Sequence, residues 1–252
     1  MPRHIDVAFT PAEAQQLARK VVIVIDLVRS TSTLAVIMSR GPSRVLIAPT
    51  IQKAQKFAAQ QTIHPLLCGE RGGRRPEGFD HGNSPREYAD LSLSGKTIVF
   101  TSSNGARAMM EVGLAPRVLL GSLLNARAVV AQTLQYAREQ DLDILLVCAG
   151  QEEKFALDDT YAAGFLVSRL INGMDASEEF VLGDGGQGAL GIFGYYQDSL
   201  RLVQQSMSGK LVTEIGLADD LPYLLQPDLL DAVPRLAQRD QLSHPWEFSL
   251  IV

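Results

Sequence analysis

The 252-residue chain has few cysteines, few aromatic residues and no long apolar run. Its two cysteines, Cys68 and Cys148, are too few for a disulfide scaffold and are not spaced as metal ligands, which is typical of a reducing compartment. No apolar run approaches the roughly 20 residues that cross a bilayer, and residues 1–10 lack the basic start and apolar stretch of a secretory signal. We therefore expect a cytoplasmic protein without a membrane partner.

The chain also lacks an excess of positive charge. Its 23 Lys and Arg residues are outnumbered by 28 Asp and Glu residues, which gives a net charge of −5. This charge argues against a nucleic-acid partner, so the basic residues that matter should act in local anion pockets. Arginines cluster at Arg71, Arg74, Arg75 and Arg86. Apolar residues make up 46% of the chain, enough for a substantial core.

One stretch carries most of the functional information, an apolar run that ends in Asp26. Residues 21–25 are all β-branched, which predicts a strand buried on both faces of a parallel sheet, and residues 34–38 predict a helix after a polar turn. Such a turn lies at the carboxyl edge of the sheet, where free N–H groups of the following helix can hold an anion. Asp26 suits a magnesium ion, Arg29 suits phosphate oxygens, and Ser30 and Thr31 offer hydroxyls. The alternative is that a hydroxyl only caps the helix and Asp26 only ends the strand.

Strands and helices alternate along the chain, which predicts an α/β fold with a mostly parallel sheet flanked by helices. Strands are expected over residues 4–9, 44–48, 65–68, 97–100 and 143–148, and helices over residues 11–20, 51–60, 106–112, 125–137 and 159–170. Residues 21–46 and 97–119 share the order strand, polar turn, helix and strand, which predicts two similar βαβ halves. The alternative is that any two βαβ units share this order. We expect a first α/β unit over 1–95, with an active-site loop at 69–87, and a second over 96–252 with a helical C-terminal part.

Further polar side chains follow the ends of other expected strands. They are Glu70, Arg71, Asp80 and Asn83 in the loop at 69–87, Ser103, Asn104 and Gly105 in the turn at 101–105, and Asp158 and Asp159 after the strand at 143–148. A loop as long as 69–87 is usually functional, whereas Asp158 is expected to cap a helix. Residues 186–191 fit Gly-x-Gly-x-x-Gly, but no β-rich strand feeds them, so we do not expect a nucleotide loop there.

These carboxylates, arginines and hydroxyls favour hydrolysis of a phosphate ester with a divalent metal. An aspartyl-phosphate enzyme of the haloacid-dehalogenase type needs a second Asp two residues after Asp26, where this chain has Val28. A cysteine phosphatase needs Cys-x5-Arg, which Cys68 and Arg74 fit, but Glu70 would then lie inside the phosphate cradle. A non-catalytic binding module for an anionic phosphorylated metabolite is another alternative, although it would not need so many carboxylates.

Five blocks of the sequence together resemble the 2-phosphosulfolactate phosphatase family. They are Asp-Leu-Val-Arg-Ser-Thr-Ser-Thr at 26–33, Gly-Glu-Arg-Gly at 69–72, Gly-Phe-Asp-His-Gly-Asn-Ser-Pro at 78–85, Thr-Ser-Ser-Asn-Gly at 101–105, and Cys-Ala-Gly at 148–150 with Leu-Asp-Asp at 157–159. The resemblance implies a magnesium-dependent acid phosphatase that hydrolyses 2-phospho-3-sulfolactate to sulfolactate and inorganic phosphate, a step toward coenzyme M. Val28, Ser30, Ala106 and Asp158 depart from the residues common in the family.

Site roles are assigned on this basis. We expect Asp26 and Asp159 as metal ligands, and Asp26, Glu70 and Asp80 as catalytic residues, the last two as further ligands or as the base that orients water. The substrate-binding residues are expected to be Arg29, Ser30, Thr31, Arg71, Asn83, Ser103, Asn104 and Gly105. The cofactor is expected to be Mg²⁺ and the partner a small anionic phosphorylated substrate. The apolar tail at 246–252 predicts self-association into a homo-oligomer.

Overall fold

The computed structural model describes residues 2–61, 64–238 and 246–250. Its strands are β1 (Arg3–Ala8), β2 (Lys20–Ile25), β3 (Arg44–Ile47), β4 (Leu66–Gly69), β5 (Thr97–Thr101), β6 (Arg117–Gly121), β7 (Asp143–Cys148), β8 (Phe180–Leu182), β9 (Pro234–Gln238) and β10 (Trp246–Leu250). Its helices are α1 (Ser30–Ser39), α2 (Ile51–Ala59), α3 (Pro85–Tyr88), α4 (Gly105–Glu111), α5 (Ala126–Glu139), α6 (Leu157–Asn172), α7 (Asp184–Tyr195), α8 (Ser199–Gln205), α9 (Met207–Glu214) and α10 (Asp220–Leu224).

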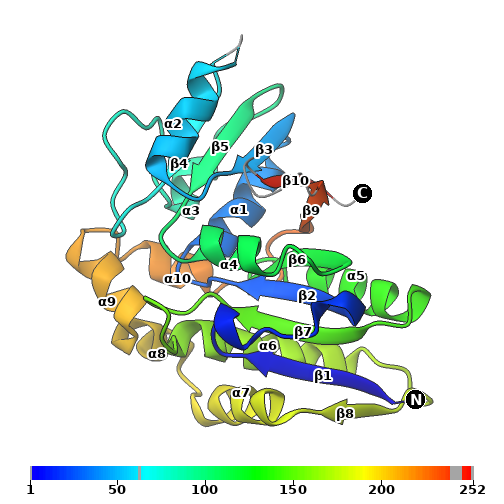
Figure 1. The fold of residues 1–252 in the computed structure, drawn as a ribbon. Helices are drawn as coiled ribbons and strands as arrows, with labels where there is room; N and C mark the ends of the chain where they lie inside the picture. Colours follow the sequence, from blue (N-terminus) through cyan, green and yellow to red (C-terminus); the bar gives the residue numbers. More distant parts are fainter. Residues whose placement is uncertain (1, 62–63, 239–245, 251–252) are drawn as a thin grey trace.

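The strands form one sheet in the order β4-β5-β3-β10-β9-β6-β2-β7-β1-β8, flanked by helices (Figure 1). The described strand pairs are parallel except those that involve β9 or β10. The predicted α/β class with a mostly parallel sheet is therefore confirmed. Within the described part of the chain, no helix combines the length and the apolar character needed to cross a membrane.

Two similar halves are present, and they exchange strands. The elements β2, α1, β3, α2 and β4 follow one another in the first repeat as β5, α4, β6, α5 and β7 do in the second. In the sheet, β2 lies between β6 and β7, and β5 lies between β3 and β4, so each repeat inserts its first strand into the other. The strands of residues 1–95 and 96–252 are thus interleaved, and residue 95 does not separate two sheets.

The strand β2 is covered on both faces and at both edges. Residues 21–25 pair in parallel register with residues 117–121 on one side and 144–148 on the other. Val21, Ile23 and Ile25 enter one apolar core, while Val22 and Val24 enter the other. Such a strand must be apolar throughout because no side chain reaches water. The first polar side chain after it emerges at the carboxyl edge of the sheet.

The carboxyl ends of β2 and β7 point toward the side of the molecule that holds the loop at 69–87 and the helices α8, α9 and α10 (Figure 1). The helical C-terminal part expected from the sequence includes the short helices α8, α9 and α10. Its position next to the carboxyl edge is not apparent from the sequence. It makes the C-terminal helices neighbours of the predicted site.

Three local predictions were wrong. Residues 11–20 form two short 3₁₀ turns, η1 (Pro11–Glu13) and η2 (Leu17–Arg19), because Gln16 between them has a left-handed φ of 53°. The Gly-x-Gly-x-x-Gly residues 186–191 are preceded by a strand, β8, and they form part of the helix α7. In the same helix, a Cβ at Gly185 would lie 2.0 Å from the carbonyl oxygen of Val7, so glycine there permits close packing on β1. Residues 234–238 form the strand β9, where helix was expected.

Candidate active site

A cavity of about 330 Å³ lies where the β2–α1 turn, the loop at 69–87, the β5–α4 turn, the turn after β7 and the helix α9 meet. It is lined by Asp26, Val28, Arg29, Ser30, Glu70, Gly72, Gly73, Asn83, Ser103, Asn104, Gln151, Glu152, Ser208, Leu211 and Val212. The structure therefore gathers seven of the predicted site residues in one place: Asp26, Arg29, Ser30, Glu70, Asn83, Ser103 and Asn104. The site lies at the carboxyl edge of a parallel sheet, as its sequence context predicts.

Asp26 is held between the starts of two helices. The N–H of Ser30, the first residue of α1, donates to its Oδ1 at 3.2 Å, and the N–H of Gly105 at the start of α4 also favours its charged form. Burial nevertheless raises the pKa of Asp26, and the nearby charge of Glu70 raises it further. A Cβ at Gly105 would lie 2.6 Å from Asp26 Oδ2, so only glycine allows this close approach. The helix starts that were expected to hold a substrate anion thus already hold a carboxylate.

Glu70 ties the loop at 69–87 to the β5–α4 turn. It is buried, and its carboxylate accepts hydrogen bonds from the N–H of Gly73 at 2.7 Å, the N–H of Ser103 at 2.5 Å and the hydroxyl of Ser103 at 3.1 Å. These three donors fix the carboxylate at the wall of the cavity. They also fix Ser103, whose side chain lines the same cavity.

The neighbouring acids Asp158 and Asp159 have different surroundings. Asp159 accepts from the N–H of Leu27 at 2.9 Å and from the N–H of Gly150 at 3.0 Å, which joins the β2–α1 turn to the turn after β7. Both oxygens of Asp158 are buried without a hydrogen-bond partner among the described residues, although the hydroxyls of Ser206 and Ser208 lie close enough to lower its pKa. Burial raises the pKa of Asp158 to about 6, and the charge of Asp26 contributes in the same direction. Burial also raises the pKa of Asp159, followed by the charges of Asp158 and Asp26.

Asp158 does not cap the helix as its position in the sequence predicts. The helix α6 begins at Leu157 with Ala156 as its N-cap, so Asp158 lies in the first helical turn and points into the protein. A buried carboxylate with two unpartnered oxygens requires a proton or a cation. Asp158 therefore joins the candidate metal ligands, although the sequence pattern favoured Asp159.

The residues fit a magnesium ion. Among the described residues, no group of three or more His, Cys, Asp or Glu side chains is arranged to hold a metal by itself. Mg²⁺, however, is commonly held by one or two carboxylates, with water and substrate phosphate completing its octahedral shell. The charge of Asp26 raises the pKa of Asp158, whose oxygens form no hydrogen bond with the described residues. The amide oxygen of Asn83, which lines the cavity, is also buried without a partner.

The two predicted phosphate-binding arginines differ in position. Arg29 lines the cavity but is buried in an ion pair, with Nη1 2.9 Å from Asp220 Oδ2, and it donates from Nη2 to the carbonyl oxygen of Gly73 at 2.6 Å. Arg71 is exposed and lines a separate groove of about 450 Å³ together with Arg74 and Arg75. The structure thus does not bring Arg71 into the cavity that holds Asp26.

The remaining predicted residues make bonds that stabilise the loops. The hydroxyl of Thr31 donates to the carbonyl oxygens of Asp26 and Gly121 and accepts from the N–H of Asp26. Asp80 accepts from the N–H of Leu67 at 2.7 Å and so anchors the loop at 69–87 to β4. Thr31, Asp80, Gly105 and Asp159 support the cavity without being among the residues that line it.

Sequence reasoning missed several lining residues. Gln151 and Glu152 come shortly after the predicted strand at 143–148, so their position near a strand end was an available signal. Ser208, Leu211 and Val212 come from the helix α9, whose amphipathic pattern says nothing about which site it covers. Only the tertiary structure reveals that contribution.

Neither cysteine is placed for nucleophilic chemistry. Cys68 is fully buried, and burial raises the pKa of its thiol to about 12. Cys148 is also buried, and burial raises its pKa well above the ordinary range. Because the thiolate is the nucleophile, both residues would be unreactive near neutral pH. This disfavours the cysteine-phosphatase alternative.

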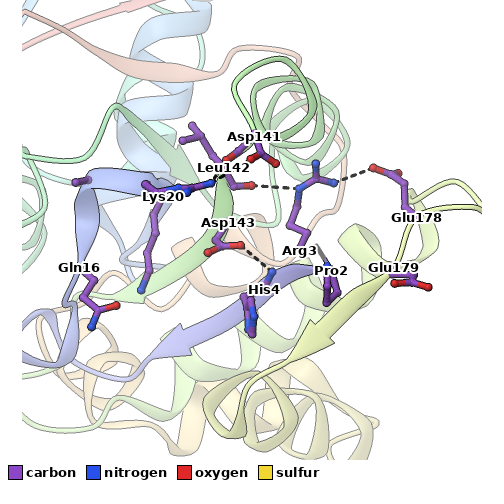
Figure 2. A pocket seen from close by; sticks show the side chains of 12 residues that line it. Pro2, Arg3, His4, Gln16, Lys20, Asp141, Leu142, Asp143, Glu178 and Glu179 are labelled. Atoms are coloured by element: carbon purple, nitrogen blue, oxygen red, sulfur yellow. Dashed lines mark hydrogen bonds and ion pairs between the residues drawn. The ribbon is translucent and has the colours of Figure 1, made fainter.

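A larger cavity, of about 920 Å³, lies at the opposite edge of the sheet, around the amino ends of β1, β2 and β7. Figure 2 shows that several of its charged groups have partners: Arg3 pairs with Glu178 at 2.8 Å, and Asp143 accepts from the N–H of His4 at 2.9 Å. This cavity contains none of the predicted site residues. The smaller cavity at the carboxyl edge is the better candidate for the active site.

The fold and the site define an α/β protein with an acidic pocket for a small ligand at the carboxyl edge of its sheet. Residues 8–239 match the family described as 2-phosphosulpholactate phosphatase, and the chain belongs to this family. It is accordingly a phosphoric monoester hydrolase. The resemblance carried by the five sequence blocks is confirmed.

Similar proteins share most of their length with this chain. A protein of Thermotoga petrophila named probable 2-phosphosulfolactate phosphatase is 34% identical over 233 residues, which cover 92% of this chain and 95% of the relative. A relative of the same name from Caldanaerobacter subterraneus subsp. tengcongensis is 33% identical over 226 residues, 88% of this chain and 90% of its own. A third, from Thermus thermophilus, is 33% identical over 220 residues, 87% of this chain and 89% of its own.

Proposed function

We propose that this chain is a magnesium-dependent phosphatase that hydrolyses 2-phospho-3-sulfolactate, or a related phosphorylated hydroxy acid, to the hydroxy acid and inorganic phosphate. The names of its relatives support the reaction. The single observation in this chain that carries the proposal is the cavity of about 330 Å³ in which Asp26 meets hydroxyl and amide groups from four other segments. A cavity of this size suits a small ligand.

Asp26 and Asp158 are the residues that would hold the metal ion. Asp26 lines the cavity, and Asp158 is the buried neighbour whose oxygens lack partners. When bound, Mg²⁺ would neutralise negative charge on the phosphoryl group and help to activate water. Asp159 would support the site from outside the cavity by joining the β2–α1 turn to the turn after β7, since both of its oxygens already accept hydrogen bonds from backbone N–H groups.

Neutral donors on the cavity wall would bind the phosphoryl oxygens. Ser30 and Asn104 carry hydrogen-bond donors there. Ser103 lines the same wall but already donates its N–H and its hydroxyl to Glu70. Because Glu70 already accepts three hydrogen bonds, its role in the proposal is to hold Ser103 and Gly73 in place. Preorganised donors of this kind stabilise the charge that develops in the transition state.

The organic part of the substrate would contact an apolar wall. Leu211 and Val212 of α9 line the cavity, and so does Val28, the residue before Arg29. This wall limits the space beside the phosphate. It favours a compact hydroxy acid over a long or bulky alcohol.

The test is release of inorganic phosphate from phosphosulfolactate and from a panel of phosphorylated hydroxy acids, with Mg²⁺ and with chelator. Wild type should release phosphate only with the metal, and Asp26→Asn should lower kcat/KM by roughly 100-fold or more because it removes a ligand charge at the reacting group. Cys68→Ser is the control, and we expect it to retain wild-type turnover.

Other outcomes would select the alternatives. Turnover that survives chelator and disappears with Cys68→Ser would establish the cysteine mechanism. Binding of phosphosulfolactate by calorimetry without any release of phosphate would indicate a binding module.

A further inference from the structure

The helix α10 contributes one fully buried carboxylate to the interior behind the cavity. Asp220 is 1% exposed. Its Oδ1 accepts a hydrogen bond from the hydroxyl of Ser84 at 2.6 Å, and its Oδ2 lies 2.9 Å from Nη1 of Arg29. Both side chains of the ion pair are 2% exposed. Each oxygen of the carboxylate is therefore used, and each partner comes from a segment that bounds the active site.

These contacts join three segments that are remote in sequence. Arg29 belongs to the β2–α1 turn, 191 positions from Asp220, and its Nη2 donates to the carbonyl oxygen of Gly73 at 2.6 Å. Ser84 directly follows Asn83, and Arg29, Gly73 and Asn83 all line the cavity. One carboxylate thus fixes the turn that carries Asp26 and two points of the loop at 69–87.

The ion pair also controls the direction of the Arg29 guanidinium. An arginine remains charged when buried, so it must keep an anionic partner. The carboxylates of Asp26 and Glu70 line the same cavity as Arg29. Without Asp220, the guanidinium would turn toward those carboxylates and would release Gly73. Asp220 holds the positive charge against the wall and leaves the acids of the cavity available.

We propose that Asp220 is a positioning residue of the active site, which acts through Arg29 and Ser84 to set the β2–α1 turn and the loop at 69–87. The inference rests on the proposed function for its kinetic consequence. It makes the C-terminal helical part a component of the active site and not only a cover for the sheet edge.

The experiment compares Asp220→Asn with Asp219→Asn. Asn keeps the shape of Asp220 but removes its charge, whereas Asp219 is exposed and pairs at 3.2 Å only with the half-exposed Arg86. We expect Asp220→Asn to lower kcat/KM for phosphate release by about 10- to 100-fold, since small displacements of positioning groups have effects of that size. Asp219→Asn should match wild type.

Two further measurements separate positioning from general destabilisation. In an Arg29→Gln background, Asp220→Asn should cause a smaller loss of kcat/KM than in wild type, no larger than that of Ser84→Ala, because only the contact with Ser84 is left to lose. Ser84→Ala, which removes only the hydroxyl donor, should fold and show a smaller loss of the same kind. It keeps the test decisive if Asp220→Asn does not fold.

Hydrogen exchange of residues 69–87 provides a readout that does not depend on turnover. Asp220→Asn should speed exchange in this loop, and Asp219→Asn should not. If wild type releases no phosphate, the proposed function fails, and this exchange measurement still decides the positioning role. Equal kinetics and equal exchange for Asp220→Asn and Asp219→Asn would overturn the inference, as would independent losses for Asp220→Asn and Arg29→Gln.

Discussion

At the scale of single residues, the contrast between Asp158 and Asp159 explains how adjacent carboxylates acquire different roles. Successive positions in a helix point about 100° apart, so Asp159 reaches two backbone N–H groups while Asp158 reaches none. Burial raises the pKa of both carboxyls, and the groups that lower it, the Leu27 and Gly150 N–H groups at Asp159 and the Ser206 and Ser208 hydroxyls at Asp158, offset burial only in part. The oxygens of Asp158, which form no hydrogen bond of ordinary geometry with the described residues, are the physical basis for a cation or a proton there.

The raised pKa of Asp158 predicts that Asp158→Asn changes the pH dependence of the free energy of unfolding. The pKa of Asp158 is raised from 3.8 to about 6, so the folded protein holds this proton more tightly than the unfolded chain. The free energy of unfolding of the metal-free protein therefore falls as the pH rises through this range, and the variant avoids that loss. We expect metal-free Asp158→Asn to be more stable than wild type near pH 7, by roughly 1–3 kcal/mol, and not near pH 4.

Urea unfolding in the presence of chelator at both pH values measures the effect. Asp159→Asn is the matched control, and it should gain less stability near pH 7 than Asp158→Asn, because the amide replaces an acceptor of the Leu27 and Gly150 N–H groups. Added Mg²⁺ should raise the stability of wild type more than that of Asp158→Asn. If Asp158→Asn were no more stable than wild type near pH 7, the raised pKa of Asp158 would be contradicted.

At the scale of elements, equivalent turns of the two repeats flank the cavity. In each, the first and last residues exchange backbone hydrogen bonds: Arg71 with Arg74, and Gln151 with Lys154. The central residues are left-handed in both turns, glycines at 72 and 73 but glutamates at 152 and 153. The repeats thus supply the same backbone shape with uncharged glycines on one side of the cavity and glutamate on the other, which makes the two sides chemically different.

A cluster of ion pairs around Glu178 connects elements at the amino ends of β1 and β8. Glu178, before β8, accepts hydrogen bonds from Arg3 of β1 and Arg138 of α5. Hydrogen bonding to Arg138 is the main cause that lowers the pKa of Glu178 from 4.5 to about 2. The stabilisation is therefore complete above about pH 4.5 and is lost as the pH falls toward about 2.

Glu178→Gln should lower the free energy of unfolding near pH 7 by roughly 0.5–1 kcal/mol, a typical value for a partly exposed ion pair. The difference from wild type should shrink as the pH is lowered from about 5 to about 3. Denaturant unfolding across this range provides the measurement, and Glu179→Gln, an exposed neighbour, is the control. A difference that does not change with pH would show that charge is not the cause.

At the scale of the whole molecule, the exchanged strands make the two halves interdependent. β2 completes the sheet of β6 and β7, while β5 completes that of β3 and β4. Neither half can cover its apolar strands alone, so the chain should unfold as one cooperative unit.

This interdependence predicts the behaviour of fragments 1–95 and 96–252. Expressed separately, each should lack a cooperative unfolding transition, and mixing them should restore the circular dichroism spectrum and the urea transition of the intact chain. The intact protein is the control. A cooperative transition of either fragment alone would support the two-unit division expected from the sequence.

Much of the fold was accessible from local patterns. The β-branched run before Asp26 predicted a fully buried strand because only parallel, doubly covered strands lack polar alternation. Strand ends followed by polar turns predicted the edge at which the site forms, and seven site residues do line one cavity. The family was likewise evident from the order of five short blocks.

The tertiary structure alone decided the pairing of distant segments. Arg29 meets Asp220 across 191 positions, and the sequence pattern of α10 gives no sign of that partner. Strand exchange likewise depends on which sheet edge each strand joins, and the pattern of apolar residues is the same for either edge. Local sequence determines periodicity and chemistry, whereas long-range packing determines which carboxylates are satisfied and which remain available for function.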